Sequence, residues 1–239
     1  MMDQITIKII YDNCKADEGL QEGWGFSCLV DLGSRKILFD TGADSRAFFS
    51  NLQKLNICCD EITDVVYSHK HSDHIAGFEE VVAKLKKDSR LFLPKKFPSK
   101  KIPSTVRTEI VENFKEIDSG VYSLVLKGGL FLYEQALLIE TLKGLVVITG
   151  CAHPGIIQLL QEAQKRLKQP IHLVLGGFHL FRNKQRQIDE VVDQFKALKV
   201  QIAAPCHCTG SLAIERFRQA FQDSFYPIGT GTILTLDKP

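Results

Sequence analysis

The sequence predicts an α/β protein whose helices and strands form layers around buried sheets. Three features of the chain support this fold class. Strand patterns alternate with helical periodicity, antiparallel hairpin patterns are mixed in among them, and two hairpins far apart in the chain have similar sequences. At 239 residues, the chain is expected to form a single domain over 1–239.

The individual elements follow from the spacing of apolar residues. Short alternating or apolar segments predict strands over 5–11, 26–32, 36–40, 63–67, 90–93, 121–126, 130–133, 136–141, 145–149, 171–175, 200–204 and 232–236. Periodicity near 3.6 residues predicts helices over 44–56, 75–87, 105–115, 155–168, 186–198 and 211–222.

The two similar hairpins are LVDLGSRKILFDTG over 29–42 and LLIETLKGLVVITG over 137–150, which are 108 residues apart. The same offset carries the strand 63–67 onto 171–175 and His71 onto His179. This constant offset favours two similar β-rich halves facing each other, with their loop histidines at one shared edge.

Composition limits the class of protein. A hydrophobic content of 44% and a charged content of 24% are ordinary for a soluble globular chain. A net charge of +2 argues against a nucleic-acid partner. The start of the chain alternates between apolar and polar residues, which predicts a strand rather than a signal peptide. No apolar run is long enough for a membrane span. The seven cysteines are an odd number and do not suggest a framework of disulfide bonds. We expect a cytoplasmic protein with no membrane partner.

The strongest functional signal is the H-x-H-x-D-H motif formed by His69, His71, Asp73 and His74. These side chains are good ligands for divalent transition metals, and they directly follow the predicted strand 63–67. Two histidines two residues apart point the same way in an extended loop, while Asp73 and His74 begin the next helical segment. This geometry suits two metals side by side. A polar loop with chance histidines is disfavoured, because the whole chain has only seven histidines.

Three further histidines, His153, His179 and His207, each follow a predicted strand and are flanked by glycine or proline. Such turn positions are exposed more often than buried, so these residues are candidate ligands or catalytic groups. The remaining His172 lies inside a predicted strand and is expected to be structural.

Other residues near these loops allow two interpretations. Asp40, at the end of a predicted strand, either orients the metal-ligand loop by accepting a hydrogen bond or simply forms an Asp-Thr-Gly turn. Cys151 and Cys208 are expected to be small apolar residues or to support the ligands from behind, since Cys206-His207-Cys208 lacks the second pair of a zinc finger. Trp24 is expected to pack at a strand start rather than line a pocket.

The segment 84–101 is rich in lysine and proline. It either contacts an anionic substrate or forms a solvated surface, and the surface interpretation is favoured.

FDTG at 39–42, SHKHSDHIAG at 68–77, His153, the strand 171–175 and His207 occur in the order found in the metallo-β-lactamase superfamily, which the chain resembles over nearly its whole length. The resemblance implies a four-layer αββα sandwich with the metal site at one sheet edge. Within the superfamily, GFSCLVDLG, YEQALLIETLKGLVVITGCAHPGI, GGFHL and PCHCTG resemble the 7,8-dihydropterin-6-methyl-4-(β-D-ribofuranosyl)aminobenzene-5′-phosphate synthase-like group.

The resemblance also implies a set of ligands and a reaction. The first of two divalent transition metals would be held by His69, His71 and His153, and the second by Asp73, His74 and His207. Zn is the expected metal, with Fe, Mn and Ni as alternatives. The metals would activate a water for hydrolysis of an ester, lactone or phosphodiester, with Asp73 as proton acceptor. His179 would hydrogen-bond a substrate oxyanion or complete the second metal shell.

The expected substrate is a small, anionic molecule, and a homo-oligomer is compatible with the sequence. Two alternatives are a pterin-linked synthase, in which the metals bind a diphosphate leaving group, and a metal-dependent ligand-binding module without turnover.

Two departures from the superfamily pattern bear on the site. The aspartate that commonly bridges the metals is replaced by Gly176-Gly177-Phe178-His179, where His179 is the nearest substitute. The segment between His74 and Glu134 is short, which predicts a trimmed cap and an altered substrate pocket.

Overall fold

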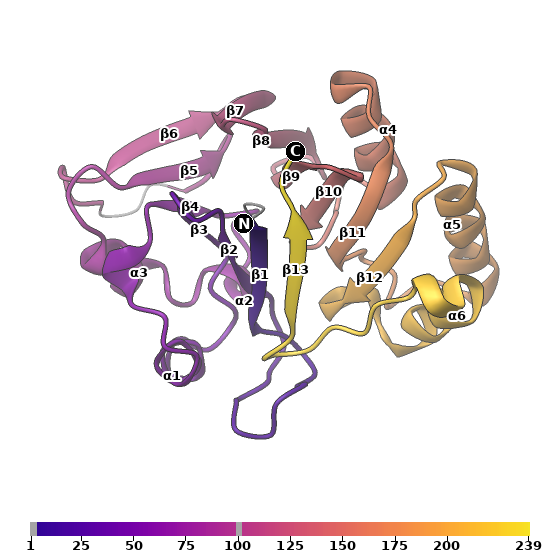
Figure 1. Cartoon of the computed structure of the whole chain (residues 1–239), viewed down its shortest axis with the longest axis horizontal. Coiled ribbons are helices and arrows are strands. Elements are labelled where there is room, and N and C mark those ends of the chain that lie inside the picture. The colour runs from indigo at the N-terminus through magenta and orange to yellow at the C-terminus, as the bar shows by residue number, and fades with distance from the viewer. Residues whose placement is uncertain (1–3, 99–101) are drawn as a thin grey trace. The chain divides into compact units, whose positions relative to one another are not determined.

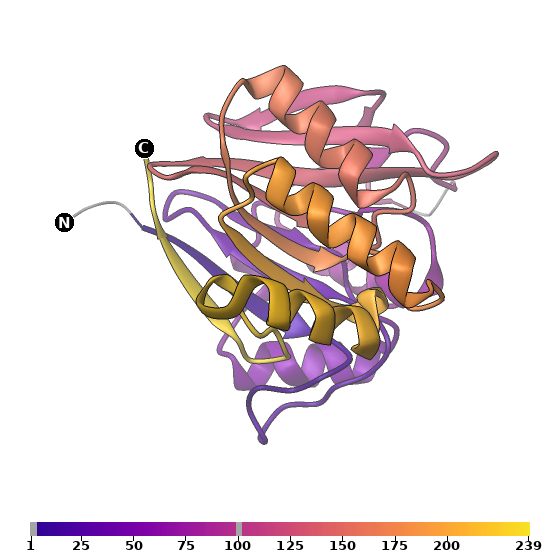
Figure 2. The ribbon, with the colours of Figure 1, turned by 90° about the vertical axis from the view of Figure 1, so that its right-hand side faces the viewer.

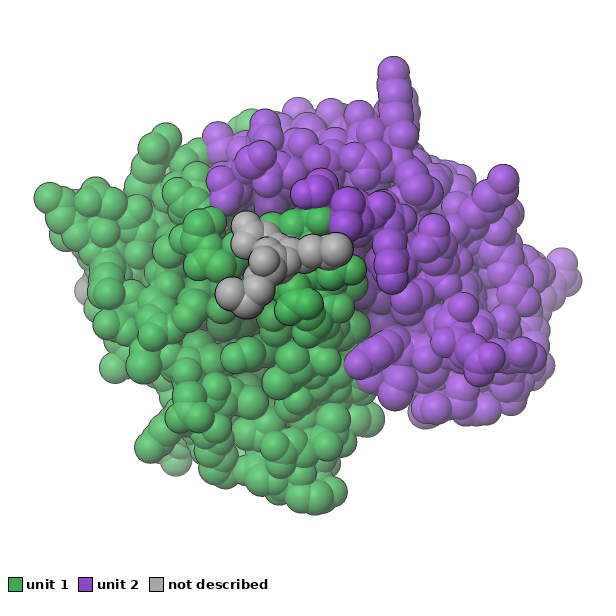
Figure 3. All heavy atoms as spheres, viewed as in Figure 1, with its two compact units in different colours: residues 1–112, 228–238 green, residues 113–227, 239 purple. Residues whose placement is uncertain are grey.

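The computed structural model describes residues 4–98 and 102–239. The chain divides into two compact units, Met1–Glu112 with Ile228–Lys238, and Asn113–Pro227 (Figure 3). We call them unit 1 and unit 2. Each has its own large sheet, as the prediction of two β-rich halves requires. The expectation of one domain over 1–239 stays a prediction.

Unit 1 is a sheet with the strand order β13-β1-β2-β3-β4-β5-β6 (Figure 1). The strands β13 to β3 are antiparallel neighbours, and those from β3 to β6 are parallel. Its elements are β1 (Gln4–Tyr11), β2 (Ser27–Asp31), β3 (Lys36–Phe39), α1 (Ser45–Lys54), β4 (Asp64–Val66), α2 (Ser72–Ile75), α3 (Phe78–Lys84), β5 (Arg90–Pro94), β6 (Arg107–Val111) and β13 (Ile233–Asp237), with one 3₁₀ turn at Cys59–Glu61.

Helices α1 and α3 cover this sheet. Helix α1 begins where the Asp44 side chain accepts hydrogen bonds from the backbone N–H groups of Arg46 and Ala47. Phe48 of α1 and Val81 of α3 belong to one buried cluster with residues of the sheet. Burying this apolar face stabilises the layer by roughly 25 cal/mol per Å² of apolar surface removed from water.

Unit 2 has the strand order β12-β11-β10-β9-β8-β7, and β10, β11 and β12 are parallel. Its elements are β7 (Phe114–Asp118), β8 (Val121–Lys127), β9 (Tyr133–Thr141), β10 (Gly144–Thr149), α4 (Ile156–Leu167), β11 (Ile171–Gly177), α5 (Gln185–Ala197), β12 (Ile202–Cys206) and α6 (Ser211–Phe221), with 3₁₀ turns at His207–Thr209 and Gln222–Ser224. Figure 2 shows α4, α5 and α6 side by side over one face of the sheet. Leu159, Phe195 and Phe217 bury these helices in a common core.

The predicted repeat has a structural counterpart. In unit 1 the antiparallel pair β2–β3 is followed by α1 and by the parallel neighbours β4 and β5. In unit 2 the antiparallel pair β9–β10 is followed by α4 and by the parallel neighbours β11 and β12. In both units, parallel strands therefore present their carboxyl ends together, where the histidine loops begin.

Three predicted elements differ from the structure. The helix expected over 105–115 is wrong, because this segment forms β6 and the start of β7. Its β-branched residues fit the half-exposed edge of a sheet better than a helix. The strand expected at 130–133 is wrong except at Tyr133, where β9 begins, and β9 includes the strand expected at 136–141. The helix expected over 75–87 is shorter: α3 covers Phe78–Lys84, and Ile75 is the last residue of the separate helix α2.

Two smaller predictions can also be compared with the structure. The ring of His172 is buried in β11, where Nδ1 lies 2.8 Å from Oε1 of Gln201, so this histidine has a structural partner. Among the described residues, no helix has the length and hydropathy needed to cross a membrane.

Candidate metal centre

In unit 1, the candidate ligands lie at the carboxyl ends of the parallel strands β3 and β4. Nε2 of His69 lies 3.0 Å from Nδ1 of His71. The ring of His69 also lies against the ring of His74, with 4.2 Å between the centroids. His69 and His74 are fully buried, whereas His71 is exposed. The motif therefore folds into a tight group of three imidazoles, with one ring open to solvent.

Asp40 organises this group from the end of β3. Its backbone has a left-handed conformation (φ 57°), which an aspartate tolerates better than most residues. Its buried carboxylate accepts hydrogen bonds from the backbone N–H of Ser68 at 2.7 Å and from the Ser68 hydroxyl at 2.6 Å. It also lies 2.7 Å from Nδ1 of His74.

These contacts assign the tautomers of two histidines. A carboxylate only accepts, so His74 carries its proton on Nδ1 and keeps a lone pair on Nε2. The hydroxyl of Ser68 donates its single proton to Asp40, so it accepts from Nδ1 of His69, 2.9 Å away. His69 therefore also keeps its lone pair on Nε2. A buried acceptor behind an imidazole is the usual arrangement for a metal-binding histidine.

Asp73 is held by a residue from another part of unit 1. Nε1 of Trp24 donates to Oδ2 of Asp73 at 3.0 Å, and the same oxygen lies 3.6 Å from Nε2 of His74. Trp24 is 49% exposed, so the expectation that it packs at a strand start is wrong. Its indole N–H has a polar partner, as is usual for this donor.

In unit 2, the buried carboxylate of Glu134 holds a histidine loop in place, as Asp40 does in unit 1. It accepts from the backbone N–H groups of Cys151 and Ala152, both at 2.7 Å, and from that of His153 at 2.8 Å. Nδ1 of His153 lies 2.8 Å from the same carboxylate. His153 therefore carries its proton on Nδ1 and directs the lone pair of Nε2 away from Glu134.

His207, His179 and two cysteines form the rest of the site in unit 2. Nε2 of His207 lies 3.4 Å from Sγ of Cys151. One donor atom each from Cys151, His179 and Cys208 lies within 4.8 Å of the others. The exposed ring of His179 also lies 4.3 Å from that of His153. Burial raises the pKa of the Cys208 thiol, but hydrogen bonds with Cys151 and His179 lower it by more, so its pKa is below the ordinary value.

Several of these residues have unusual backbones. Ala152, His179 and His207 adopt left-handed conformations, with φ between 48° and 56°. This conformation is uncommon for residues other than glycine, asparagine and aspartate, and it tends to occur at functional sites. The strand-end turns of unit 2 thus aim their side chains at some conformational cost.

The structure groups the predicted residues by unit. His69, His71, Asp73, His74 and Asp40 come together in unit 1. In unit 2, His179 lies beside His153, and His207 lies beside Cys151.

Glu134 and Ser68 were not among the predicted residues. The sequence gives only a weak signal for Glu134, a charge at the start of a strand that also contains Gln135 and Glu140. For Ser68 the sequence contains no comparable signal.

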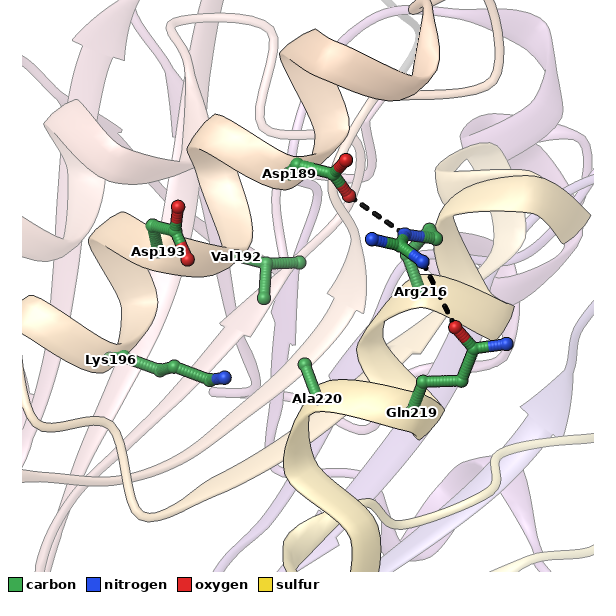
Figure 4. Close-up of a pocket in the computed structure, with 7 residues that line it drawn as sticks. All are labelled: Asp189, Val192, Asp193, Lys196, Arg216, Gln219 and Ala220. Atoms are coloured by element: carbon green, nitrogen blue, oxygen red, sulfur yellow. Dashed lines mark hydrogen bonds and ion pairs between the residues drawn. The ribbon is translucent and has the colours of Figure 1, made fainter.

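The pockets of the two units differ in their relation to these residues. A pocket of about 760 Å³ in unit 1 is lined by Lys70 and Ser72 of the histidine motif, together with residues of α2 and α3. In unit 2, a pocket of about 380 Å³ lies between α5 and α6 (Figure 4). There Arg216 bonds Asp189 at 2.7 Å and Gln219 at 3.0 Å, and none of the candidate ligands lines it. Only the first pocket adjoins candidate metal ligands.

In the segment 84–101, the described lysines before and after β5 lie at the surface, whereas Leu91–Pro94 of β5 between them are buried. Lys86 lies 3.5 Å from Asp60, and Lys95 lies 2.5 Å from Glu112, with all four side chains well exposed. Lys100 and Lys101 lie outside the described residues.

Comparisons with known proteins point in one direction. The family model of the anti-Pycsar protein Apyc1 matches residues 21–113. The 7,8-dihydropterin-6-methyl-4-(β-D-ribofuranosyl)-aminobenzene-5′-phosphate synthase of Methanocaldococcus jannaschii is 25% identical, covering 88% of this chain and 89% of its own length. The uncharacterized protein MJ0448 of the same organism is 29% identical, covering 89% of this chain and 94% of its own length.

A solved structure is also similar over the full length. It is the crystal structure of Tm1679, described as a metal-dependent hydrolase of the β-lactamase superfamily, with 29% identity and a TM-score of 0.83. The match covers 98% of this chain and 100% of that one. The predicted resemblance to the metallo-β-lactamase superfamily and the predicted fold class are thereby confirmed.

Proposed function

We propose that this protein is a metal-dependent hydrolase that uses metal-activated water on an ester, lactone or phosphodiester. One observation carries the proposal: a buried carboxylate in each unit, Asp40 and Glu134, lies against Nδ1 of a candidate ligand and leaves Nε2 as the donor. Nδ1 of the structural His172, by contrast, lies against the neutral amide oxygen of Gln201. The similarity to Tm1679 over the full chain supports the same class of function.

The donor atoms of unit 1 fit a metal. Two imidazole nitrogens that bind one zinc ion at about 2.0–2.1 Å in tetrahedral geometry lie roughly 3.3 Å apart. Nε2 of His69 and Nδ1 of His71 are 3.0 Å apart, which is close to that separation. The same pair of nitrogens could share a proton instead, so metal content is the decisive measurement.

Two divalent transition metals, with Zn expected, complete the proposal. The ligands would be His69, His71 and His153 for the first metal, and Asp73, His74 and His207 for the second. When bound, such metals polarise a substrate oxygen and lower the pKa of water toward roughly 7.

The chain's own residues would orient and transfer protons. Asp73, held by the indole N–H of Trp24, would accept a proton from the attacking water. His179 is exposed and would donate a hydrogen bond to the oxyanion that develops on the substrate. Lys70 lines the pocket beside the motif and is the candidate contact for a small anionic substrate, although Glu79 and Glu80 line the same pocket.

The test is metal content per chain, measured on protein purified without added metal, for wild type, His71→Ala and His172→Asn. His71 is exposed, so its removal should leave the fold intact, and His172→Asn is a matched histidine change away from the site. We expect about two metals in wild type and in His172→Asn, fewer in His71→Ala, and turnover of generic esters or phosphodiesters that a chelator abolishes. Wild-type protein that binds no added zinc would contradict the proposal.

A synthase is the second candidate, because the Methanocaldococcus jannaschii synthase covers 88% of this chain. In that case the metals would bind a diphosphate leaving group. Release of pyrophosphate from a pterin diphosphate and its co-substrate, without ester or phosphodiester turnover, would favour it. Metal binding without either reaction would favour a ligand-binding module.

A further inference from the structure

Cys151 occupies a special position in unit 2. It lies two residues after the end of β10 and is 3% exposed, with Sγ 3.4 Å from Nε2 of His207. Its backbone N–H is fixed by the carboxylate of Glu134, which also fixes His153 two residues later. One buried carboxylate thus sets the positions of a thiol and an imidazole in the same turn.

The distance between the thiol and His207 fits a shared metal ion. Zinc binds thiolate sulfur at about 2.3 Å and imidazole nitrogen at about 2.0–2.1 Å, so a tetrahedral pair lies roughly 3.6 Å apart. The observed 3.4 Å is close to this value. The same distance also fits a hydrogen bond between the thiol and the ring nitrogen, so the test must distinguish a shared metal ion from that bond.

The end of β11 leaves no room for a negatively charged side chain at Gly176 or Gly177. A side chain at Gly177 would place its Cβ 2.4 Å from the carbonyl oxygen of Gly150, and one at Gly176 would lie 2.1 Å from that of Thr149. Neither position can therefore hold the carboxylate that superfamily hydrolases commonly place after this strand. Cys151 lies at the end of the neighbouring strand β10, and its thiolate can supply the missing negative charge.

We propose that Cys151 binds, as a thiolate, the same metal ion as His207. The inference rests on the proposed metal-dependent function and adds one ligand to it. On binding, the S–H bond of Cys151 breaks, its proton passes to solvent, and sulfur donates an electron pair to the metal. A soft thiolate selects zinc, cobalt or iron over magnesium or calcium.

The test replaces the metal by Co²⁺ and records the absorption spectrum of wild type, Cys151→Ser and Cys206→Ser. A thiolate ligand gives a near-ultraviolet charge-transfer band, whereas visible bands report cobalt binding whatever the ligands. We expect the charge-transfer band in wild type and in Cys206→Ser, and its loss in Cys151→Ser. Cys206→Ser is a matched control, because this thiol is also buried and next to His207 in the sequence, but belongs to none of the groups of candidate metal ligands that the described residues form.

Other outcomes separate the two proposals. Cobalt binding without the charge-transfer band, or with a band that survives in Cys151→Ser, would overturn the thiolate ligand and leave the hydrolase proposal standing. Wild-type protein that binds no cobalt would overturn the metal-dependent function itself, and this inference with it. If Cys151→Ser does not fold, X-ray absorption of the zinc-loaded wild type decides, since absence of a sulfur shell near about 2.3 Å would refute the inference.

Discussion

Replacing Glu134 by glutamine is the sharpest test of the arrangement in unit 2. The carboxylate accepts four hydrogen bonds, two at each oxygen. One oxygen bonds the backbone N–H groups of Cys151 and Ala152, and the other bonds the backbone and ring N–H groups of His153. A glutamine of the same shape keeps one acceptor and places an NH₂ group where the other was. In either orientation of the amide, two N–H groups that were bonded to a carboxylate oxygen then face the NH₂ group, which cannot accept a hydrogen bond from them.

The cost can be worked from these contacts. A hydrogen bond to a charged acceptor contributes about 1.5–3 kcal/mol, and Glu134 is 1% exposed, so water cannot replace the lost acceptor. Two lost bonds give roughly 3–6 kcal/mol, and relaxation of the turn brings the expected loss of unfolding free energy to about 3 kcal/mol. Metal affinity should fall about 10–100-fold, as is typical when a group behind a metal-binding histidine is removed.

Both quantities are measurable on the same protein. Urea denaturation of the metal-free chain gives the stability, and a zinc titration with a chelator as competitor gives the affinity. Glu140→Gln is the matched control, since Glu140 lies on the same strand and is partly exposed, and its carboxylate accepts a hydrogen bond from the side chain of Gln169. It should change stability by less than about 0.5 kcal/mol. If Glu134→Gln behaves like this control in both assays, the role assigned to Glu134 is refuted.

Three further substitutions test unit 1. Asp40→Asn keeps a residue that tolerates φ 57° but removes one hydrogen-bond acceptor. It should lower the unfolding free energy by about 2 kcal/mol and the zinc affinity at least about tenfold. Unchanged zinc affinity would contradict the orientation of His74 by Asp40. Trp24→Phe removes the hydrogen-bond donor to Asp73 and keeps an aromatic ring. The value of kcat/KM for a hydrolysed ester should fall about fivefold, and the midpoint of urea denaturation should not change. Equal kcat/KM in the variant and wild type would show that this hydrogen bond does not assist the reaction. Asp64→Asn removes the buried carboxylate that Arg35 and Arg90 share. It should lower the free energy of unfolding, measured by urea denaturation, by about 3 kcal/mol. An unchanged midpoint would refute this role of Asp64.

The histidine motif could be found from the sequence because its information is local. Residues two apart in an extended loop point the same way, and a loop after a buried strand lies at a sheet edge. These rules place His69 beside His71 without knowledge of any distant contact, and the structure has them 3.0 Å apart. The strands that carry the loops were predictable for the same reason, since β10 and β11 are short, apolar and bounded by glycine or proline.

Residues that act across the fold could not be found this way. Glu134 lies 19 positions before His153, and Trp24 lies 49 positions before Asp73. Periodicity places Glu134 only between the strands expected over 130–133 and 136–141, and the loop that its carboxylate contacts depends on strand order. The helix wrongly predicted over 105–115 failed for a related reason: the β-branched residues of this segment form a strand because β6 pairs with β5, and the spacing of apolar residues alone does not reveal that pairing.

The repeat separates the scaffold from the chemistry. Thr41 and Thr149 are 108 residues apart, and each donates a hydrogen bond from its hydroxyl to a backbone carbonyl. The hydroxyl of Thr41 bonds the carbonyl of His74, after β4, at 3.2 Å, and that of Thr149 bonds the carbonyl of Gly177, at the end of β11, at 2.9 Å. The carboxylates that orient the imidazoles do not follow this offset, because Asp40 ends β3 whereas Glu134 lies on β9. The two units therefore share the position of these hydroxyl donors but fix their histidines with different residues. An offset in sequence locates equivalent loops, and the partners of each side chain must then decide its role.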